Sequence, residues 1–407
     1  MQYKKSVWYE ESVWKKIASL LVSVICSFSL LSSESKGEEF LSAYWKRPTP
    51  LQTLSNTFSL YPDECGTCHT SQYDAWKDSL HSKAVGPGLI GQLGTDLKSV
   101  PKDPQFAESC YFCHAPMMEQ SEMKEARGKR QEAEEYIKNP SFDNRLKLSG
   151  VSCVVCHLRE GTIYGPPAKA GVRGQGSGVR SEQQKAHNNF IEKDFFQKAE
   201  FCAACHQLDE GYELNGKLLV NTYREWKESI YGQNNVPCQN CHMPDRQHLW
   251  QGIHDKEMVL RGVRIESVQY EKGVRLIITN SGVGHYFPTY TTPLVVVKGF
   301  MLDKKGKVIQ GSLKEAFIGR KVSLDLSEEV FDTRIPPQKS FEFDYSARGG
   351  YSDSKIAFEV WVYPDEFYNR FYRDLLKDKD GGFDGKEIEK ALKITERSGY
   401  ILFKEVL

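Results

Sequence analysis

The sequence lacks an excess of charge of either sign, because its 407 residues include 54 Lys and Arg against 54 Asp and Glu. A balanced charge gives no support for a basic surface that binds nucleic acid. An apolar run of spanning length is also missing, since the longest run, Ile17 to Leu31, has 15 residues and a membrane-spanning helix needs about 20. The composition, with 40% apolar and 27% charged residues, is otherwise that of a globular chain long enough for two domains.

The first 35 residues have the pattern of a secretory signal peptide. Lysines precede the apolar run, and small serines follow it before the polar segment that begins at Lys36. Cys26 lies inside the run and is interpreted as one of its apolar residues. We expect export to the periplasm, or to the extracellular space or cell surface, with no stable membrane insertion after cleavage. A signal that is kept as an anchor is the alternative.

The remaining sequence divides into three parts and predicts a mixed fold. Residues 36–257 predict a mostly α-helical, loop-rich domain, and residues 366–407 predict a C-terminal helical tail. Between them, residues 258–365 predict a small antiparallel β-sandwich, because short β-rich runs alternate with turn signals. These runs are 263–269, 274–279, 294–300, 341–345 and 356–363.

Three further segments are interpreted as ordinary structure. The charged stretch Met117 to Lys138 predicts a solvated surface helix. The stretch Gly171 to Gly178 (GVRGQGSG) predicts a flexible loop rather than a nucleotide-binding turn, because no predicted strand precedes it. The stretch Asp378 to Glu387 (DKDGGFDGKE) predicts a plain turn, because no register gives a calcium loop its Gly and Glu.

Ten of the 11 cysteines form five pairs at one spacing, and a histidine follows each pair. Such C-x-x-C-H motifs attach c-type haem covalently, with the two thiols on the vinyl groups of one haem edge and the histidine under the iron. Zinc ribbons need pairs in twos, and neither zinc nor a redox dithiol explains the repeated histidine. The sequence therefore predicts five haem c groups. The attachment cysteines are Cys65, Cys68, Cys110, Cys113, Cys153, Cys156, Cys202, Cys205, Cys238 and Cys241, and the proximal ligands are His69, His114, His157, His206 and His242.

Five histidines remain outside the motifs, which is one possible distal ligand for each iron. They are His81, His187, His248, His254 and His285. His81 and His254 each follow a motif histidine by 12 residues. In a helix that offset is about 18 Å, so each would reach a neighbouring haem. His248 could instead contact a propionate or face solvent, and Met117, Met118 and Met243 are interpreted as packing residues rather than ligands.

Several segments resemble the multihaem cytochromes of the c-552/c-554 type, in the superfamily of hydroxylamine oxidoreductase and pentahaem nitrite reductase. They are YDAWKDSLHSKA, GVSCVVCH, CAACHQ, NTYREWKESIYGQNNVPCQNCHMP, RQHLWQGIH and GHYFPT, and they cover roughly residues 60 to 300. The resemblance implies stacked haem pairs and distal histidines from distant segments, which supports His81, His187, His254 and His285.

The sequence also departs from the patterns of these relatives. All five motifs end in His, whereas the nitrite reductases carry Lys at the catalytic haem. No motif in this sequence identifies the tyrosine that crosslinks the catalytic haem in the hydroxylamine oxidoreductases. Tyr223 and Tyr231 are the nearest candidates. In GHYFPTY, Tyr290 stands where the resemblance leads us to expect Gly.

These observations predict an electron carrier rather than an enzyme, because bis-histidine iron has no open position for a substrate. Two alternatives stay open. One is an oxidoreductase with one open haem that acts on a small nitrogen or sulfur compound. The other is a homo-oligomer or filament subunit in which a histidine ligates a haem of the next chain. All three readings require redox partner proteins.

Overall fold

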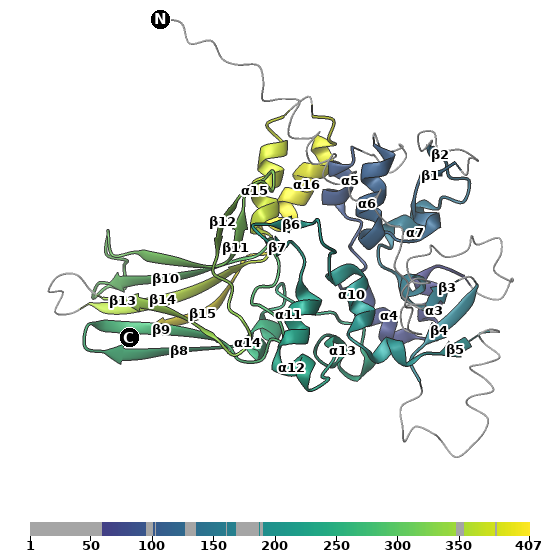
Figure 1. The fold of residues 1–407 in the computed structure, drawn as a ribbon. Helices are drawn as coiled ribbons and strands as arrows, with labels where there is room; N and C mark the ends of the chain where they lie inside the picture. The colour runs from purple at the N-terminus through teal and green to yellow at the C-terminus, as the bar shows by residue number, and fades with distance from the viewer. Residues whose placement is uncertain are drawn as a thin grey trace, which may run out of the picture.

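The structure is a computed structural model that describes residues 59–94, 101, 103–126, 136–159, 161–167, 187, 190–346, 354–378 and 381–407. The predicted signal peptide, Cys26 and the segment 171–178 lie outside these residues. Within the described part, no helix is both long and apolar enough to cross a membrane. Figure 1 shows short helices on one side of the molecule and long strands on the other.

The region that carries the motifs is built from short helices and very short strands. Several helices begin at a side-chain cap, as where Asp103 accepts from the Phe106 amide and Asp255 from the Met258 amide. The helices are α3 (Pro62–Gly66), α4 (Thr70–Lys77), α5 (Pro87–Gln92), α6 (Pro104–His114), α7 (Asn144–Leu148), α8 (Cys153–His157), α10 (Glu200–His206), α11 (Thr222–Glu228), α12 (Ile230–Gln233), α13 (Cys238–His242) and α14 (Lys256–Gly262), with 3-10 turns η3 (Met118–Gln120), η4 (Asp194–Gln197) and η5 (Pro244–Arg246). The strands are β1 (Met123–Glu125), β2 (Tyr136–Lys138), β3 (Leu158–Arg159), β4 (Thr162–Gly165), β5 (Phe190–Glu192), β6 (Glu213–Leu214) and β7 (Lys217–Leu218).

The surface helix predicted for residues 117–138 is wrong. Its described parts form η3 and the antiparallel pair β1–β2. Glu119, Gln120 and Glu122 are buried there rather than solvated. The prediction assumed that charged and polar residues face solvent. Here they are buried with partners, because Glu122 is paired with the buried Lys147 and the Gln120 amide donates to two backbone carbonyls.

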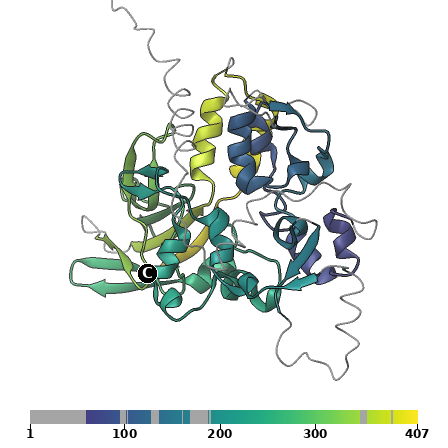
Figure 2. The same cartoon turned by 45° about the vertical axis from the view of Figure 1, so that its right-hand side comes forward.

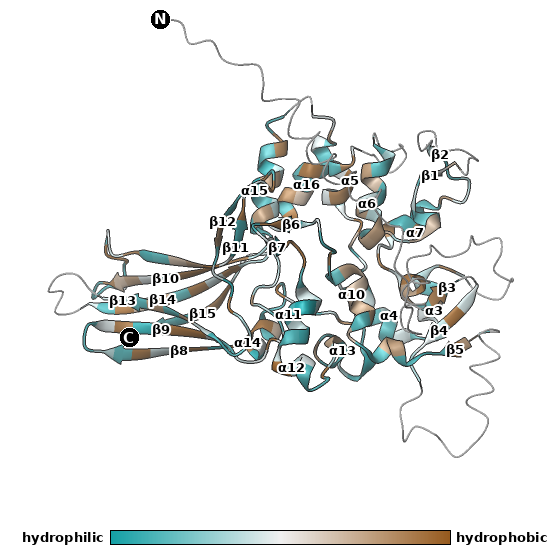
Figure 3. Cartoon of the chain, in the orientation of Figure 1, coloured by the Kyte–Doolittle hydropathy of each residue, from teal (hydrophilic) through white to brown (hydrophobic). Residues whose placement is uncertain are grey.

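The strands form two antiparallel sheets that pack into a sandwich. One sheet has the order β12-β11-β10-β14-β15 and the other has β13-β9-β8. Alternate residues of β9, including Leu276 and Ile278, point into a single apolar core, which Figure 3 shows as brown positions along the strands. The strands are β8 (Val263–Tyr270), β9 (Gly273–Asn280), β10 (Leu294–Leu302), β11 (Lys314–Val322), β12 (Glu329–Asp332), β13 (Ser340–Tyr345), β14 (Lys355–Tyr363) and β15 (Tyr400–Val406).

All five predicted β-rich runs are strands, and the sequence missed β11, β12 and β15. The predicted C-terminal tail is helical over α15 (Glu366–Leu375) and α16 (Gly385–Thr395). Its end differs from the prediction, because β15 returns to the sheet and pairs with β14. The pairing satisfies the backbone groups of a segment whose sequence, YILFKEV, also suits a strand.

The helix α16 packs against the motif region, whereas α15 packs on α16 and also contacts the sandwich, where Arg370 donates to the Val322 carbonyl at 3.2 Å. Figure 2 shows α16 beside α5 and α6. The approach to α5 is close, since a Cβ added to Gly91 would lie 2.7 Å from the Ile388 Cδ1 atom. These helices therefore form part of the surroundings of the second motif, which ends α6.

Candidate functional site

Four of the five C-x-x-C-H motifs end a helix with their histidine. The helices α8 and α13 consist of a motif alone, and α6 and α10 end with one. Because residues three and four apart share a helix face, the second thiol and the histidine of each motif lie on the face of the first thiol. The first motif differs, since Cys65 lies in α3 and His69 caps the start of α4.

Eight of the ten histidines form four pairs of rings from distant parts of the chain. The ring centroids are 6.0 Å apart for His69–His187, 6.2 Å for His81–His206, 6.2 Å for His157–His248 and 6.3 Å for His242–His285. Two imidazoles that bind one metal from opposite sides, with bonds of about 2.0 Å and nitrogens about 1.1 Å from the ring centres, would be separated by about 6.2 Å. Each pair joins one motif histidine to one histidine outside the motifs, so the residues fit haem iron.

Hydrogen bonds leave Nε2 of several of these histidines available. The Nδ1 atom lies 2.8 Å from the Tyr164 carbonyl in His157, 2.7 Å from the Gln251 carbonyl in His242, and 2.9 Å from the Tyr286 carbonyl in His285. A carbonyl accepts only from a protonated Nδ1, which leaves the lone pair on Nε2. Each of these contacts therefore selects the tautomer that binds iron through Nε2.

Burial lowers the pKa of seven of the paired histidines and so favours the neutral imidazole, which is the form that binds a metal. It lowers the pKa of His81 to about 3, with a further contribution from the neighbouring His206. It lowers the pKa of His157, His206 and His285 to about 4. Trp250 adds packing, because its ring lies edge-on to both His81, at 4.6 Å, and His248, at 5.0 Å.

Contacts between cysteines show which motifs are neighbours. Thiols of different motifs lie within hydrogen-bonding reach of each other, without forming a disulfide. These contacts are Cys65 with Cys153, Cys113 with Cys205, and Cys202 with Cys238. With the motifs numbered in chain order, motif 1 is therefore next to motif 3, and motif 4 is next to motifs 2 and 5. Cys156 of motif 3 is also close enough to Cys205 for the charge of Cys205 to raise its pKa. Motif 4 is therefore a neighbour of motifs 2, 3 and 5 and lies at the centre of the five motifs.

The second motif has no partner histidine. The His114 Nδ1 atom lies 2.8 Å from the Ala84 carbonyl, and no other imidazole is stacked against its ring among the described residues, which include all ten histidines. The predicted role of His254 as a distal ligand finds no support in the geometry. Its Nε2 atom lies 3.0 Å from the Asp365 carboxylate.

Other predicted candidates lie near the motifs in different roles. The Tyr223 hydroxyl donates to Glu200 at 3.2 Å, and burial raises the pKa of this tyrosine to about 12. The Tyr231 ring lies beside Gly284, close to the His285 loop. Met117 is fully buried in an apolar cluster with Leu146, in agreement with its interpretation as a packing residue.

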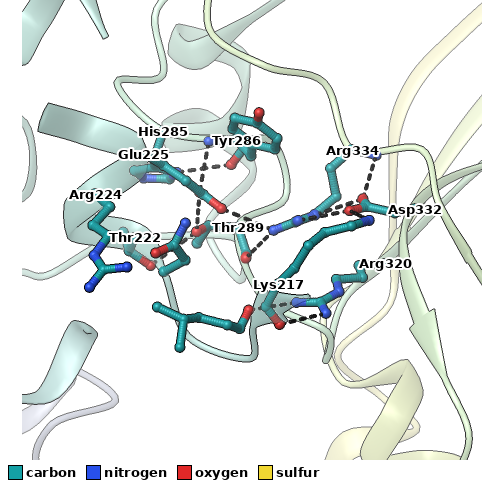
Figure 4. Close-up of polar contacts among 12 residues, drawn as sticks. Lys217, Thr222, Arg224, Glu225, His285, Tyr286, Thr289, Arg320, Asp332 and Arg334 are labelled. Atoms are coloured by element: carbon teal, nitrogen blue, oxygen red, sulfur yellow. Dashed lines mark hydrogen bonds and ion pairs between the residues drawn. The ribbon is translucent and has the colours of Figure 1, made fainter. Parts of the chain in front are cut away.

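A buried polar network holds the His285 loop against α11 (Figure 4). Glu225 accepts from the Tyr286 amide at 3.0 Å, the Thr289 hydroxyl at 2.7 Å and Arg334 at 3.0 Å. Burial raises the pKa of Glu225, and its partners oppose that rise. Sequence reasoning missed this network, because its members come from α11, the loop and the sandwich.

A second residue that sequence reasoning missed is Tyr290, at the end of the same loop. The Nδ1 atom of His206 lies 2.5 Å from the Tyr290 hydroxyl. The only signal in the sequence was that a tyrosine stands where Gly was expected. One loop of the sandwich thus contacts the histidines of two motifs.

The chain is similar to known multihaem cytochromes. Residues 64–158 match the family model for cytochrome c554 and c-prime. Cytochrome c-554 of Nitrosomonas europaea is 27% identical over 177 residues, which cover 41% of this chain and 68% of that protein. The crystal structure of a penta-heme cytochrome c552 from Thermochromatium tepidum superimposes with a TM-score of 0.57 at 16% identity, covering 86% of this chain and 99% of the other. Together with the five motifs, these matches identify the chain as a multihaem c-type cytochrome.

Proposed function

We propose that this protein transfers electrons through five covalently attached haem groups, four of which have two histidine ligands. The four imidazole pairs at 6.0 to 6.3 Å carry the proposal. Haem iron that is closed by two imidazoles exchanges one electron and has no open position for a substrate. His187, His81, His248 and His285 would then be the distal ligands of motifs 1, 4, 3 and 5, in that order.

The contacts between motif cysteines support a route for the electrons. Neighbouring thiols would hold neighbouring haem edges, so the route runs from motif 1 to motif 3 and then to motif 4. From motif 4 it branches to motifs 2 and 5. The paths from motif 1 to motif 2 and from motif 1 to motif 5 are equally long, so motifs 1, 2 and 5 are the proposed contact points for redox partner proteins. We further propose export to the periplasm, where such partners would be met.

The second motif supports a second candidate function at one haem. His114 has no opposing imidazole, so its iron would keep an open face for a small molecule. Groups that can transfer a proton are linked to this motif through α15. Tyr368 on this helix is close enough to Cys110 for their charges to interact, and Asp365 at the start of the same helix is paired with His254. A small nitrogen or sulfur compound is the substrate class that fits an open haem with acid–base groups nearby.

The test of the ligand assignment is His81→Ala, read by EPR of the oxidised protein. Removing the partner of His206 should convert one low-spin haem to high spin, and mass spectrometry should still find five haems attached. His254→Ala is the matched control, because it lies at the same offset from a motif histidine and should leave the low-spin signals unchanged. An unaltered spectrum in His81→Ala, or a new high-spin signal in the control, would contradict the assignment.

Carbon monoxide added to the reduced parent protein separates the two candidate functions. Binding at one haem would support an open iron at motif 2. Its absence, together with purely low-spin signals, would exclude the second candidate and leave electron transfer alone.

A further inference from the structure

The histidine of motif 4 differs from the histidines of motifs 2, 3 and 5 in its Nδ1 partner. For His114, His157 and His242 the partner is a backbone carbonyl, at 2.7 to 2.8 Å. For His206 it is the phenol oxygen of Tyr290, at 2.5 Å. Every residue has a backbone carbonyl, whereas the phenol oxygen is present only because residue 290 is a tyrosine.

We propose that Tyr290 is a positioning residue that lowers the reduction potential of the haem at motif 4 through its hydrogen bond with His206. The proposal rests on the proposed function, because it takes His206 as an iron ligand. It adds that the sandwich tunes the electron route, since Tyr290 lies on the same loop as His285, the partner of His242 in motif 5.

Buried contacts hold the Tyr290 oxygen in place. The Thr222 hydroxyl lies within hydrogen-bonding reach of Tyr290 and 3.0 Å from the Thr289 hydroxyl. Thr289 in turn donates to Glu225, whose side chain is 4% exposed and pairs with Arg334, which is 5% exposed. This chain of contacts links the loop to α11 on one side and to the sandwich on the other, so the phenol is fixed relative to His206.

The direction of the effect follows from the chemistry of the ligand. An acceptor at Nδ1 increases the electron density of the imidazole and makes Nε2 a stronger donor. A stronger donor stabilises ferric iron more than ferrous iron, so the reduction potential falls. Motif 4 is next to motifs 2, 3 and 5, and a change in its potential therefore alters three electron-transfer steps at once.

The test is Tyr290→Phe in the full exported protein, which removes the hydroxyl and keeps the ring. We expect five haems by mass, one haem with a raised midpoint potential in a spectroelectrochemical titration, and a changed g value for one low-spin EPR signal. We expect the ferric-to-ferrous ratio of that haem at a fixed potential to change by up to about tenfold, which corresponds to about 59 mV for one electron.

Two further variants keep the outcome interpretable. Tyr345→Phe is the matched control, because its hydroxyl donates to the Ser312 carbonyl inside the sandwich and should shift no potential. Thr222→Val leaves both His206 and Tyr290 intact and should shift the same potential by a smaller amount. It replaces Tyr290→Phe as the test if that variant does not accumulate with five haems.

The results separate failure of this inference from failure of the proposed function. Titrations of Tyr290→Phe and Thr222→Val that superimpose on the parent would overturn the role of Tyr290. If His81→Ala still produced a high-spin haem, the ligand assignment would stand without it. A shift of equal size in Tyr345→Phe would also overturn the inference, because it would show a general effect of the sandwich.

Discussion

The sandwich has one continuous apolar core of 17 buried residues, whereas the described part of the motif region has buried clusters of at most six. The strands bury alternate side chains against each other, so the sandwich can fold from its own sequence. In the motif region the cysteines and histidines form the predicted haem sites, and the apolar side chains bury less surface than those of the sandwich. The difference teaches that the haem groups must supply much of the core on that side.

The largest expected effect is the loss of the haem groups. If all ten motif cysteines are replaced by alanine, we expect the motif region to lose its protection from hydrogen exchange, while the strands β9, β10 and β14 stay protected. Mass spectrometry of peptides from both regions would measure this. Equal loss of protection in the sandwich would break the comparison, because it would mean that the strands also depend on haem.

An intermediate effect is expected from Lys147→Met in the motif region. Lys147 and Glu122 form an ion pair with side chains 2% and 9% exposed, and the Lys147 ammonium also donates to the Tyr111 hydroxyl at 2.8 Å. Removing one member of a buried pair leaves the other charge uncompensated and costs about 3–5 kcal/mol. The free energy of unfolding of the holoprotein in denaturant should fall by that amount.

The control for Lys147→Met is Lys77→Met, which breaks the exposed pair with Asp74. Exposed pairs contribute about 0–1 kcal/mol, so this variant should unfold almost as the parent does. Equal costs for the two variants would mean that haem attachment, and not the buried polar cluster, determines the stability of this side.

The smallest expected effect lies at the boundary between the regions and depends on pH. Burial disfavours the charged form of Asp332, but hydrogen bonds from Arg334 and Lys217 outweigh it and hold the pKa of this carboxyl well below its usual range. A pKa that is lower in the folded state contributes stability above the unfolded value of about 4, and that stability is lost as the pH falls.

Asp332→Asn should therefore lower the free energy of unfolding by about 1–3 kcal/mol at neutral pH. The difference from the parent should shrink as the pH falls below about 4, because the carboxylate is then protonated in the unfolded chain while it stays charged in the folded protein to lower pH. Thermal unfolding at a series of pH values measures this. A difference that stays constant with pH would show that the charge of Asp332 does not contribute to the stability.

Local patterns explain why part of the fold was predictable. Short β-rich runs between turn signals identified β8, β9, β10, β13 and β14, because both the runs and the turns are local in the sequence. The edge strand β12 has only four residues and little apolar signal. The strand β15 was missed because its partner β14 lies about 40 residues earlier, beyond two helices.

The candidate site was also predictable only in part from the sequence. His81 and His254 have the same offset from a motif histidine, yet the structure pairs His81 with His206 and brings His254 to Asp365. The helix that the offset assumed ends at Lys77, before His81. The fate of each histidine therefore depends on how the chain turns after the motif, which the offset does not describe.

The sequence by itself determined the haem chemistry, because each C-x-x-C-H motif is complete within five residues. It also determined the five strands that are β-rich runs between local turn signals. Only the tertiary structure decided which histidines face each other, which motifs are neighbours and that Tyr290 contacts His206. Those relations join segments far apart in the chain, such as His69 with His187 and His206 with Tyr290. They are set by packing and by buried hydrogen bonds, which no local spacing encodes.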